Sequence, residues 1–332
     1  MNSTAYRSWG IAFAIVGVLA FSFRPILIKL SYAAHPVSPV TLLFLRMALS
    51  LPFFVAIGWW LRNRQPRLTR RDWLGIVGLG FLGYYAASFL DFVGLQWVGA
   101  GVGRLILYLF PTLVVLLSFL FLHKRPTRRE IVALVTSYFG IALVVSSQLH
   151  AESRLFALGA ALVFASALCY AVYLVIGSQI VKRVGSMRFT AYSTVVATVP
   201  AVIQFLVMES PAQALALPAA VWWYAIILAT FSTVLPLFLQ AEALNRIGAS
   251  HFALIGALGP VSVAVTSALG LDEPFTAVQA VGGALVIFGV LLVSLQKKGR
   301  TWISESAAGP RWYARHRKDS ARAAPRRSLA KA

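Results

Sequence analysis

Long apolar runs recur along almost the whole chain, and they constrain its fold more than any other feature. A helix of about 20 apolar residues, rising about 1.5 Å per residue, crosses the hydrocarbon core of a bilayer. Hydrophobic residues make up 59% of the sequence and charged residues only 12%, against about 25% charged residues in a typical soluble domain. The chain is therefore predicted to fold in a membrane.

We expect ten spanning segments, at residues 9–30, 39–61, 73–92, 99–122, 130–147, 155–177, 188–208, 219–241, 248–270 and 276–296. The first is interpreted as an uncleaved span, because Arg24 and Lys29 interrupt its apolar run. Lipid leaves only helices or closed barrels, and the strands of a barrel would alternate polar and apolar side chains. The predicted fold class is thus an all-α integral membrane protein.

The charges in the loops predict the orientation of the spans. The loops RNRQPRLTRRD and HKRPTRRE, after the second and fourth spans, are strongly basic, and the loops after the sixth and eighth spans also carry lysine or arginine. Basic loops stay on the cytoplasmic side. We expect both termini to be cytoplasmic, in a multi-pass protein of a cell membrane of the bacterial inner-membrane type. Because the net charge of +20 comes from such loops and the C-terminal tail, no nucleic-acid partner is expected.

An internal repeat divides the spans into two sets of five. Pro111 and Pro260 align at an offset of 149 positions (260 − 111), and the alignment holds without a gap over 95–144. The informative identities are Gly99/Gly248, Ala100/Ala249, Pro111/Pro260, Ser118/Ser267, Thr127/Thr276, Phe139/Phe288 and Gly140/Gly289. Five is an odd number, so the second repeat must enter the membrane inverted relative to the first. The loop charges agree, since Lys124 is predicted to be cytoplasmic and its counterpart Glu273 external.

Three regions follow from this division: a first five-helix repeat at 9–147, a second at 155–296 and a tail at 297–332. The tail carries eleven lysine and arginine residues against two acids and has no apolar face. It is predicted to be a disordered cytoplasmic segment. The alternative is a tail that contacts anionic lipid headgroups.

Four charged residues inside the spans of the first repeat are candidates for the transport pathway: Arg24, Arg46, Asp91 and Arg104. Each is placed toward the external side of its span. An arginine inside a membrane helix is costly and usually faces a pathway or a partner. We expect the four to line the outward mouth of a pathway, where Asp91 neutralises one arginine and the others attract a carboxylate. The alternative is that they extend to the headgroups or lock helices together.

Prolines inside the spans predict bends. Pro25 removes a backbone donor beside Arg24, and Pro111 and Pro260 stand at equivalent points of the repeat. These three are candidates for gating, and simple packing kinks are the alternative.

Polar side chains deeper in the spans complete the candidate set. Tyr84, Tyr108, Tyr170 and Gln240 are candidate lining residues, because a buried polar group needs a partner. Glu242 stands one helical turn before Arg246, which predicts an ion pair on one helix. A proton-coupling site or a cytoplasmic gate at Glu242 is the alternative.

The order and spacing of these features resemble EamA-type carriers of the drug/metabolite transporter superfamily. The similarity rests on Lys29 at the end of the first span, Arg46 in the second, and the series Pro260, Glu273, Thr276, Gly282 and Gly289, and it covers residues 9 to 296. The resemblance implies a central cavity between the repeats, with spans five and ten peripheral. It also implies efflux or uptake of small metabolites such as amino acids, or of drugs. The sequence departs from the family at Phe21–Pro25, where many members have a tryptophan-glycine pair, and at Lys124, where a glutamate is usual.

We therefore expect a secondary transporter, more specifically an exporter, of small organic metabolites such as amino acids or other carboxylates. Inverted repeats favour this function because they can exchange conformations around a shared site. The alternative is a flippase for a lipid-linked intermediate, or a sugar-phosphate carrier of the same superfamily. The sequence has no paired catalytic carboxylates, no metal-ligand spacing and no phosphate-binding loop, so neither an enzyme nor a cofactor is expected. The expected partners are a small-molecule substrate and membrane lipids, and a homodimer is left open.

Overall fold

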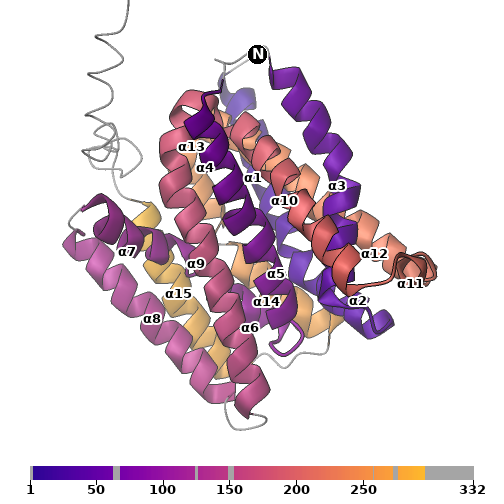
Figure 1. The fold of residues 1–332 in the computed structure, drawn as a ribbon. Helices are drawn as coiled ribbons and strands as arrows, with labels where there is room; N and C mark the ends of the chain where they lie inside the picture. Colours follow the sequence, from indigo (N-terminus) through magenta and orange to yellow (C-terminus); the bar gives the residue numbers. More distant parts are fainter. Residues whose placement is uncertain are drawn as a thin grey trace, which may run out of the picture. The chain divides into compact units, whose positions relative to one another are not determined.

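A computed structural model describes residues 3–62, 68–123, 126–148, 153–256, 258–271 and 276–295, and every regular element within them is a helix (Figure 1). The elements of the first repeat are α1 (Ser3–Ser22), α2 (Arg24–Ala34), α3 (Pro39–Arg62), α4 (Arg70–Gly80), the π-helix η1 (Phe81–Ala86), α5 (Ala87–Gly94), α6 (Ala100–Leu107), α7 (Phe110–Leu122) and α8 (Arg128–Gln148). Those of the second are α9 (Ser153–Val184), α10 (Ser186–Met208), α11 (Pro211–Leu215), α12 (Ala219–Ala229), the π-helix η2 (Thr230–Val234), α13 (Leu235–Gly256), α14 (Leu258–Gly270) and α15 (Ala277–Ser294). Lys124, Glu273 and the predicted tail 297–332 lie outside the described residues.

The all-helical membrane fold is confirmed, whereas the count of ten spans is not. Within the described ranges, eight helical segments are long and apolar enough to cross a membrane, and two shorter apolar helices follow at Leu258–Gly270 and Ala277–Val293. The predicted loop at 242–247 is wrong, because α13 continues through it without a break. Its residues, Glu-Ala-Leu-Asn-Arg-Ile, contain no glycine or proline, and an ion pair between Glu242 and Arg246 supports the helical turn.

Equivalent spans of the two repeats pack against each other in opposite directions. In the α3–α10 pair, Phe44 stacks on Phe205 with ring centroids 4.1 Å apart, and the Tyr192 hydroxyl donates to the Gly58 carbonyl at 3.3 Å. Residue numbers rise along α3 as they fall along α10, so the two helices are antiparallel. Figure 1 shows these two helices side by side. The second spans of the two repeats therefore have inverted orientations.

The α8–α15 pair has the same inverted relationship and is packed through small residues (Figure 1). A β-carbon on Gly140 would lie 2.6 Å from the Gly282 carbonyl oxygen, and one on Gly289 would lie 2.7 Å from the Ala133 carbonyl oxygen. Gly140 and Gly289 are repeat equivalents, and so are Ala133 and Gly282, each pair at the offset of 149. The two contacts are thus one contact made twice, as a two-fold axis requires. Small residues allow the close backbone approach that holds membrane helices together.

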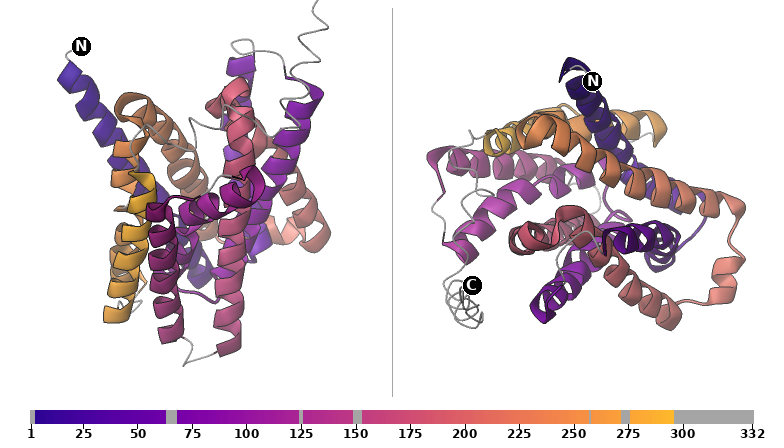
Figure 2. Two further views of the ribbon diagram at one scale, coloured as in Figure 1. Left: turned by 90° about the vertical axis from the view of Figure 1, so that its left-hand side faces the viewer. Right: turned by 90° about the horizontal axis from the view of Figure 1, so that it is seen from above.

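The first span of each repeat packs on the other repeat through a matching glycine. Gly10 of α1 lies against Arg246 and Ile247 of α13, and a β-carbon there would come within 2.7 Å of both side chains. Gly159 of α9 lies in the same way against Trp97 and Val98, at 3.1 and 2.8 Å. The two contacts are related by the repeat, because Gly10 and Gly159, Trp97 and Arg246, and Val98 and Ile247 each differ by 149 positions. Figure 2 shows the indigo α1 alongside the orange α13.

Irregular helix segments also recur at the repeat offset. The π-helices η1 and η2 begin at Phe81 and Thr230, which are 149 positions apart. In the first repeat a helix break precedes Pro111, where α6 ends at Leu107 and α7 begins at Phe110. Pro25 likewise stands in the first turn of α2, directly after α1 ends. Pro25 and Pro111 thus stand in the first turns of helices, where the missing backbone donor of a proline is tolerated.

Candidate functional site

The four charged residues predicted for the pathway converge in the structure, although they come from four separate helices. Arg24 begins α2, Arg46 lies in the middle of α3, Asp91 near the end of α5, and Arg104 in α6. Arg46, Asp91 and Arg104 are buried, with 4%, 5% and 7% of their surfaces exposed. The side chains therefore turn into the protein instead of extending to the headgroups.

One ion pair and one shared hydroxyl join three of these residues. The Arg24 Nη2 lies 3.3 Å from the Asp91 Oδ2. The Ser88 hydroxyl, one turn before Asp91 on α5, accepts hydrogen bonds from the Arg46 Nη2 at 2.9 Å and from the Arg24 Nη2 at 3.4 Å. Residues three apart on a helix share a face, which is why α5 presents both acceptors together.

Two phenylalanine rings hold the guanidinium groups in place. Arg24 and Arg46 both lie over the Phe92 ring, with their Cζ atoms 5.6 and 5.3 Å from its centroid. Arg104 lies over the Phe21 ring at 4.7 Å, and Arg24 reaches the same ring at 6.0 Å. A guanidinium within about 6 Å of an aromatic centroid is attracted by the negative face of the ring. Arg24 thus stands between Arg46 and Arg104.

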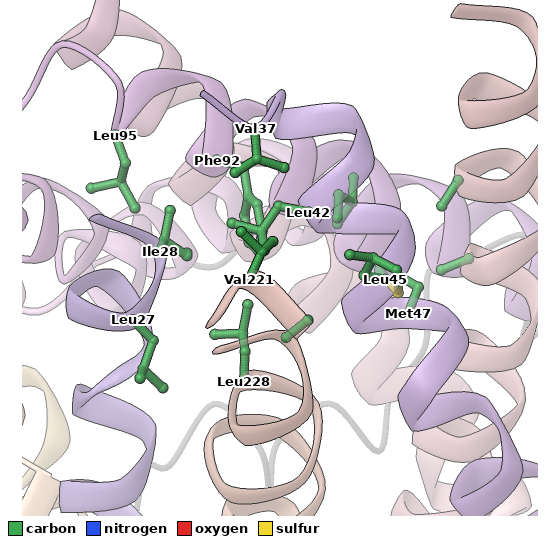
Figure 3. Close-up of a cluster of buried hydrophobic side chains, with 14 residues drawn as sticks. Leu27, Ile28, Val37, Leu42, Leu45, Met47, Phe92, Leu95, Val221 and Leu228 are labelled. Atoms are coloured by element: carbon green, nitrogen blue, oxygen red, sulfur yellow. The ribbon is translucent and has the colours of Figure 1, made fainter. Parts of the chain in front are cut away.

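Phe92 is fixed from behind by the largest apolar cluster around it. Figure 3 shows Phe92 packed beside Val37, Leu42 and Val221, so α3, α5 and α12 all contribute to its support. The hydroxyl of Tyr32 on α2 also donates to the Phe92 carbonyl oxygen at 2.9 Å. The Phe92 ring under Arg24 and Arg46 is therefore backed by residues of both repeats.

The arrangement leaves two guanidinium groups without a carboxylate. Among the described residues, no acidic side chain lies within ion-pair distance of Arg46 or Arg104. The Nε atoms of Arg24, Arg46 and Arg104 are buried and find no hydrogen-bond acceptor in the described part of the chain. An arginine stays charged in a protein, and a buried charge without a partner is strongly unfavourable. The site is thus suited to receive an anion.

This positive site adjoins the second repeat. The Arg104 Nη2 and the Ser22 Oγ each lie 3.5 Å from the position that a β-carbon on Gly259 of α14 would occupy. The Tyr108 hydroxyl lies 3.6 Å from the position that a β-carbon on Gly256 of α13 would occupy. Arg104 also interacts electrostatically with Tyr170 of α9. The charged residues of one repeat therefore face glycine backbone and an aromatic side chain of the other.

The three candidate tyrosines adjoin the same cluster. Tyr170 is within electrostatic range of Arg24 and Arg104, and Tyr84 of Arg46. The Phe110 and Tyr170 rings meet edge to face at 5.2 Å, and Tyr173 joins Tyr170 to Tyr84 at 5.9 and 5.2 Å. Because η1 carries Tyr84, its π-helical turn sets where that side chain enters the cluster.

Gln240 and Glu242 lie elsewhere, in or beside the α1–α13 contact, and neither pairs with Arg24, Arg46 or Arg104. Gln240 packs against Gly17 in the α1–α13 contact, with its Cγ 3.5 Å from the β-carbon position of that glycine. The Glu242 Oε1 lies 2.7 Å from the Arg246 Nη2, and the Arg246 guanidinium stands over the Tyr6 and Phe13 rings at 4.7 and 4.9 Å. The predicted ion pair on one helix is confirmed.

The repeat explains where Gln240 lies. Gln240 is the equivalent of Asp91 at the offset of 149, and Tyr173 and Ala253 are the equivalents of Arg24 and Arg104. The second repeat thus places uncharged residues where the first places its ions. The charged residues of the cluster therefore belong to the first repeat and have no charged counterparts in the second.

Sequence reasoning missed Ser88, Phe21, Phe92 and Gly259. A signal existed for Ser88, since its spacing of three from Asp91 puts both on one helical face. No sequence signal marks the two phenylalanines among 22 in the chain, or Gly259 among 24 glycines. As for metals, the described residues contain no group of three or more His, Cys, Asp or Glu side chains that could bind one.

Comparison with known proteins gives a consistent result. The chain is 27% identical over 293 residues to the uncharacterized transporter YcbK of Bacillus subtilis, which covers 87% of this chain and 93% of that protein. It is 24% identical over 290 residues to an uncharacterized transporter of Archaeoglobus fulgidus, covering 86% and 94%. A solved protein structure matches the fold with a TM-score of 0.59 at 17% identity, over 87% of this chain and 97% of that one. Residues 8–146 and 157–295 each match the EamA-like transporter family, and the chain therefore belongs to that family of membrane transporters.

Proposed function

We propose that this transporter carries small organic metabolites with an acidic group, such as amino acids or other carboxylates, and that it works as an exporter. The observation that carries the proposal is the pair of buried guanidinium groups, Arg46 and Arg104, without a carboxylate among the described residues. A planar guanidinium binds a carboxylate through two parallel hydrogen bonds. A bound acidic substrate would supply the charge that the protein leaves out.

Alternating access follows from the two-fold relationship between the repeats. Contacts such as Gly140–Gly282 and Ala133–Gly289 are equivalent, so each repeat can adopt the conformation of the other with little change in packing. The cluster lies against Gly259 of the second repeat, where a relative motion of the repeats would open or close it. We propose that Pro25, Pro111 and Pro260 are the bending points.

The topology of the loops supports an orientation with both termini in the cytoplasm. Reporter fusions at the C-terminus and after Gln148, between the predicted fifth and sixth spans, test this assignment. A reporter that is active only inside the cell should work at the C-terminus and fail after Gln148. The opposite result would reverse the assignment and place the arginine cluster toward the cytoplasmic half.

Transport by purified protein in proteoliposomes is the central experiment. Uptake of amino acids, monocarboxylates and dicarboxylates is compared with uptake of organic cations and neutral sugars, with and without a proton gradient. We expect flux of anionic or zwitterionic compounds, and roughly a tenfold or greater loss in Arg104→Gln and Arg46→Gln. Uptake of cations alone would reject the proposal.

A matched control is available in Arg188. It is as buried as Arg46, with 4% exposure, and lies over the Tyr192 ring at 5.4 Å, away from the cluster. Arg188→Gln should leave substrate preference unchanged, while Arg104→Lys should retain part of the flux because it keeps the charge. Sugar phosphates and fluorescent lipids form two further arms of the assay. Movement of either one in place of carboxylates would favour the sugar-phosphate carrier or the flippase.

A further inference from the structure

The acids of the described chain are nearly all engaged outside the cluster. The sequence contains ten aspartate and glutamate residues, and the described ranges include five of them. Asp72 pairs with Arg183, Glu242 pairs with Arg246, Glu130 accepts from the Thr127 backbone at 2.6 Å, and Glu209 accepts from the Ser38 hydroxyl. Only Asp91 reaches the three arginines. Within the described residues, the cluster therefore has three guanidinium groups and one carboxylate.

The surplus charge is divided between two places. Arg24 and Asp91 form the central ion pair. Arg46 shares the Phe92 ring with Arg24, and Arg104 shares the Phe21 ring with Arg24, so the unpaired guanidinium groups flank the pair. Arg46 also interacts electrostatically with Tyr84, whereas Arg104 interacts with Tyr108 and Tyr170. Arg46 and Arg104 therefore have different neighbours, and each lies over a different aromatic ring.

A single carboxylate could therefore compensate only one of the two. The other guanidinium would stay buried with an unpartnered Nε, which a low-dielectric site penalises heavily. Two acidic groups joined by a short carbon chain would compensate both, one on each side of the neutral Arg24–Asp91 pair. Bulk salt cannot replace them efficiently, because both guanidinium groups are buried away from the surface.

We infer that the site takes a small organic dianion, one acidic group at Arg46 and the other at Arg104. The inference rests on the proposed function, namely that this cluster binds the transported compound. It goes further by fixing the number of charges on that compound and the arginine that each charge meets.

The test compares linear dicarboxylates of three to six carbons with their own monoamides and monocarboxylates, as competitors or labelled substrates in proteoliposomes at pH 7.5. At that pH both carboxyl groups are ionised. We expect at least one dicarboxylate to have roughly tenfold or greater preference over its monoamide, since a charge-assisted hydrogen-bonded pair is lost with the second carboxylate. Arg46→Gln and Arg104→Gln should each reduce that preference to about onefold, whereas Arg188→Gln should keep it.

The outcomes separate this inference from the proposed function. If monocarboxylates or amino acids move as well as every dicarboxylate, and both variants slow them, the cluster binds anions and the dianion is rejected. If no anion moves through the wild-type protein, the proposed function itself fails. If either glutamine variant folds, transports and retains the full preference for a dicarboxylate, the assignment of one acidic group to that arginine is wrong.

Discussion

The Nη2 atom of Arg104, in the first repeat, lies 3.5 Å from the place where a β-carbon on Gly259, in the second repeat, would stand. A buried cation of one repeat thus rests against bare backbone of the other. Glycine at this position places no side chain of its own against the guanidinium. The contact also lies directly before Pro260 of α14, so a bend at that proline would change the surroundings of Arg104.

Enlarging Gly259 tests this contact. Gly259→Val should weaken binding of acidic substrates roughly tenfold, about 1.4 kcal/mol, because its methyl groups would press on the guanidinium. Gly259→Ala should be mild, since 3.5 Å is an ordinary contact distance. Apparent affinity in proteoliposomes measures both effects. Gly270→Val on the same helix meets nothing within 4 Å and serves as the control. Equal losses in the two valine variants would remove Gly259 from the site.

Closing the small-residue contact between α8 and α15 should destabilise the fold. Gly282→Ala places a β-carbon 2.6 Å from the Gly140 carbonyl oxygen, and overpacking of this kind costs about 1–3 kcal/mol. Thermal unfolding in detergent should show a lower midpoint. Gly78→Ala in α4 has open space and should be neutral or stabilising by up to about 1 kcal/mol through helix propensity. A Gly282→Ala midpoint at or above that of Gly78→Ala would contradict the tight contact.

Removing one partner of the Arg24–Asp91 ion pair should lower the free energy of unfolding more than removing both partners. Asp91→Asn leaves all three guanidinium groups uncompensated, and loss of one partner of a buried pair costs about 3–5 kcal/mol. The double variant Arg24→Gln/Asp91→Asn should recover part of that loss. A double-mutant cycle from denaturant unfolding measures the coupling, expected at about 0.5–3 kcal/mol. Additive single effects would show that the pair is not formed.

The ion pair on α13 should matter little for stability. Glu242 is 43% exposed at its side chain, and an ion pair across one helical turn contributes about 0.3–0.5 kcal/mol. Glu242→Gln should therefore lower the unfolding free energy by less than about 1 kcal/mol. We also expect the ratio of flux with and without a proton gradient to stay at the wild-type value. A ratio that falls to one in this variant would identify Glu242 as the coupling site.

Local sequence patterns determined much of the fold. Apolar runs of the length of a bilayer predict spanning helices, since lipid offers no partner for an open backbone. The Thr127/Thr276 identity predicts equivalent positions, and both residues begin helices, where each threonine hydroxyl accepts from the backbone three residues on. Arginines inside apolar runs predicted the residues of the cluster, because a charge inside a membrane span is costly and usually faces a cavity or a partner.

Only the tertiary structure decided which groups meet. The choice of Asp91 for Arg24, the sharing of Ser88, and the rings of Phe21 and Phe92 depend on contacts between helices far apart in the sequence. The π-helices η1 and η2 likewise appear only in the structure, at positions that no pattern in the sequence marked. Helix formation is a local property of the chain in lipid, whereas the pairing of buried charges belongs to the assembled bundle.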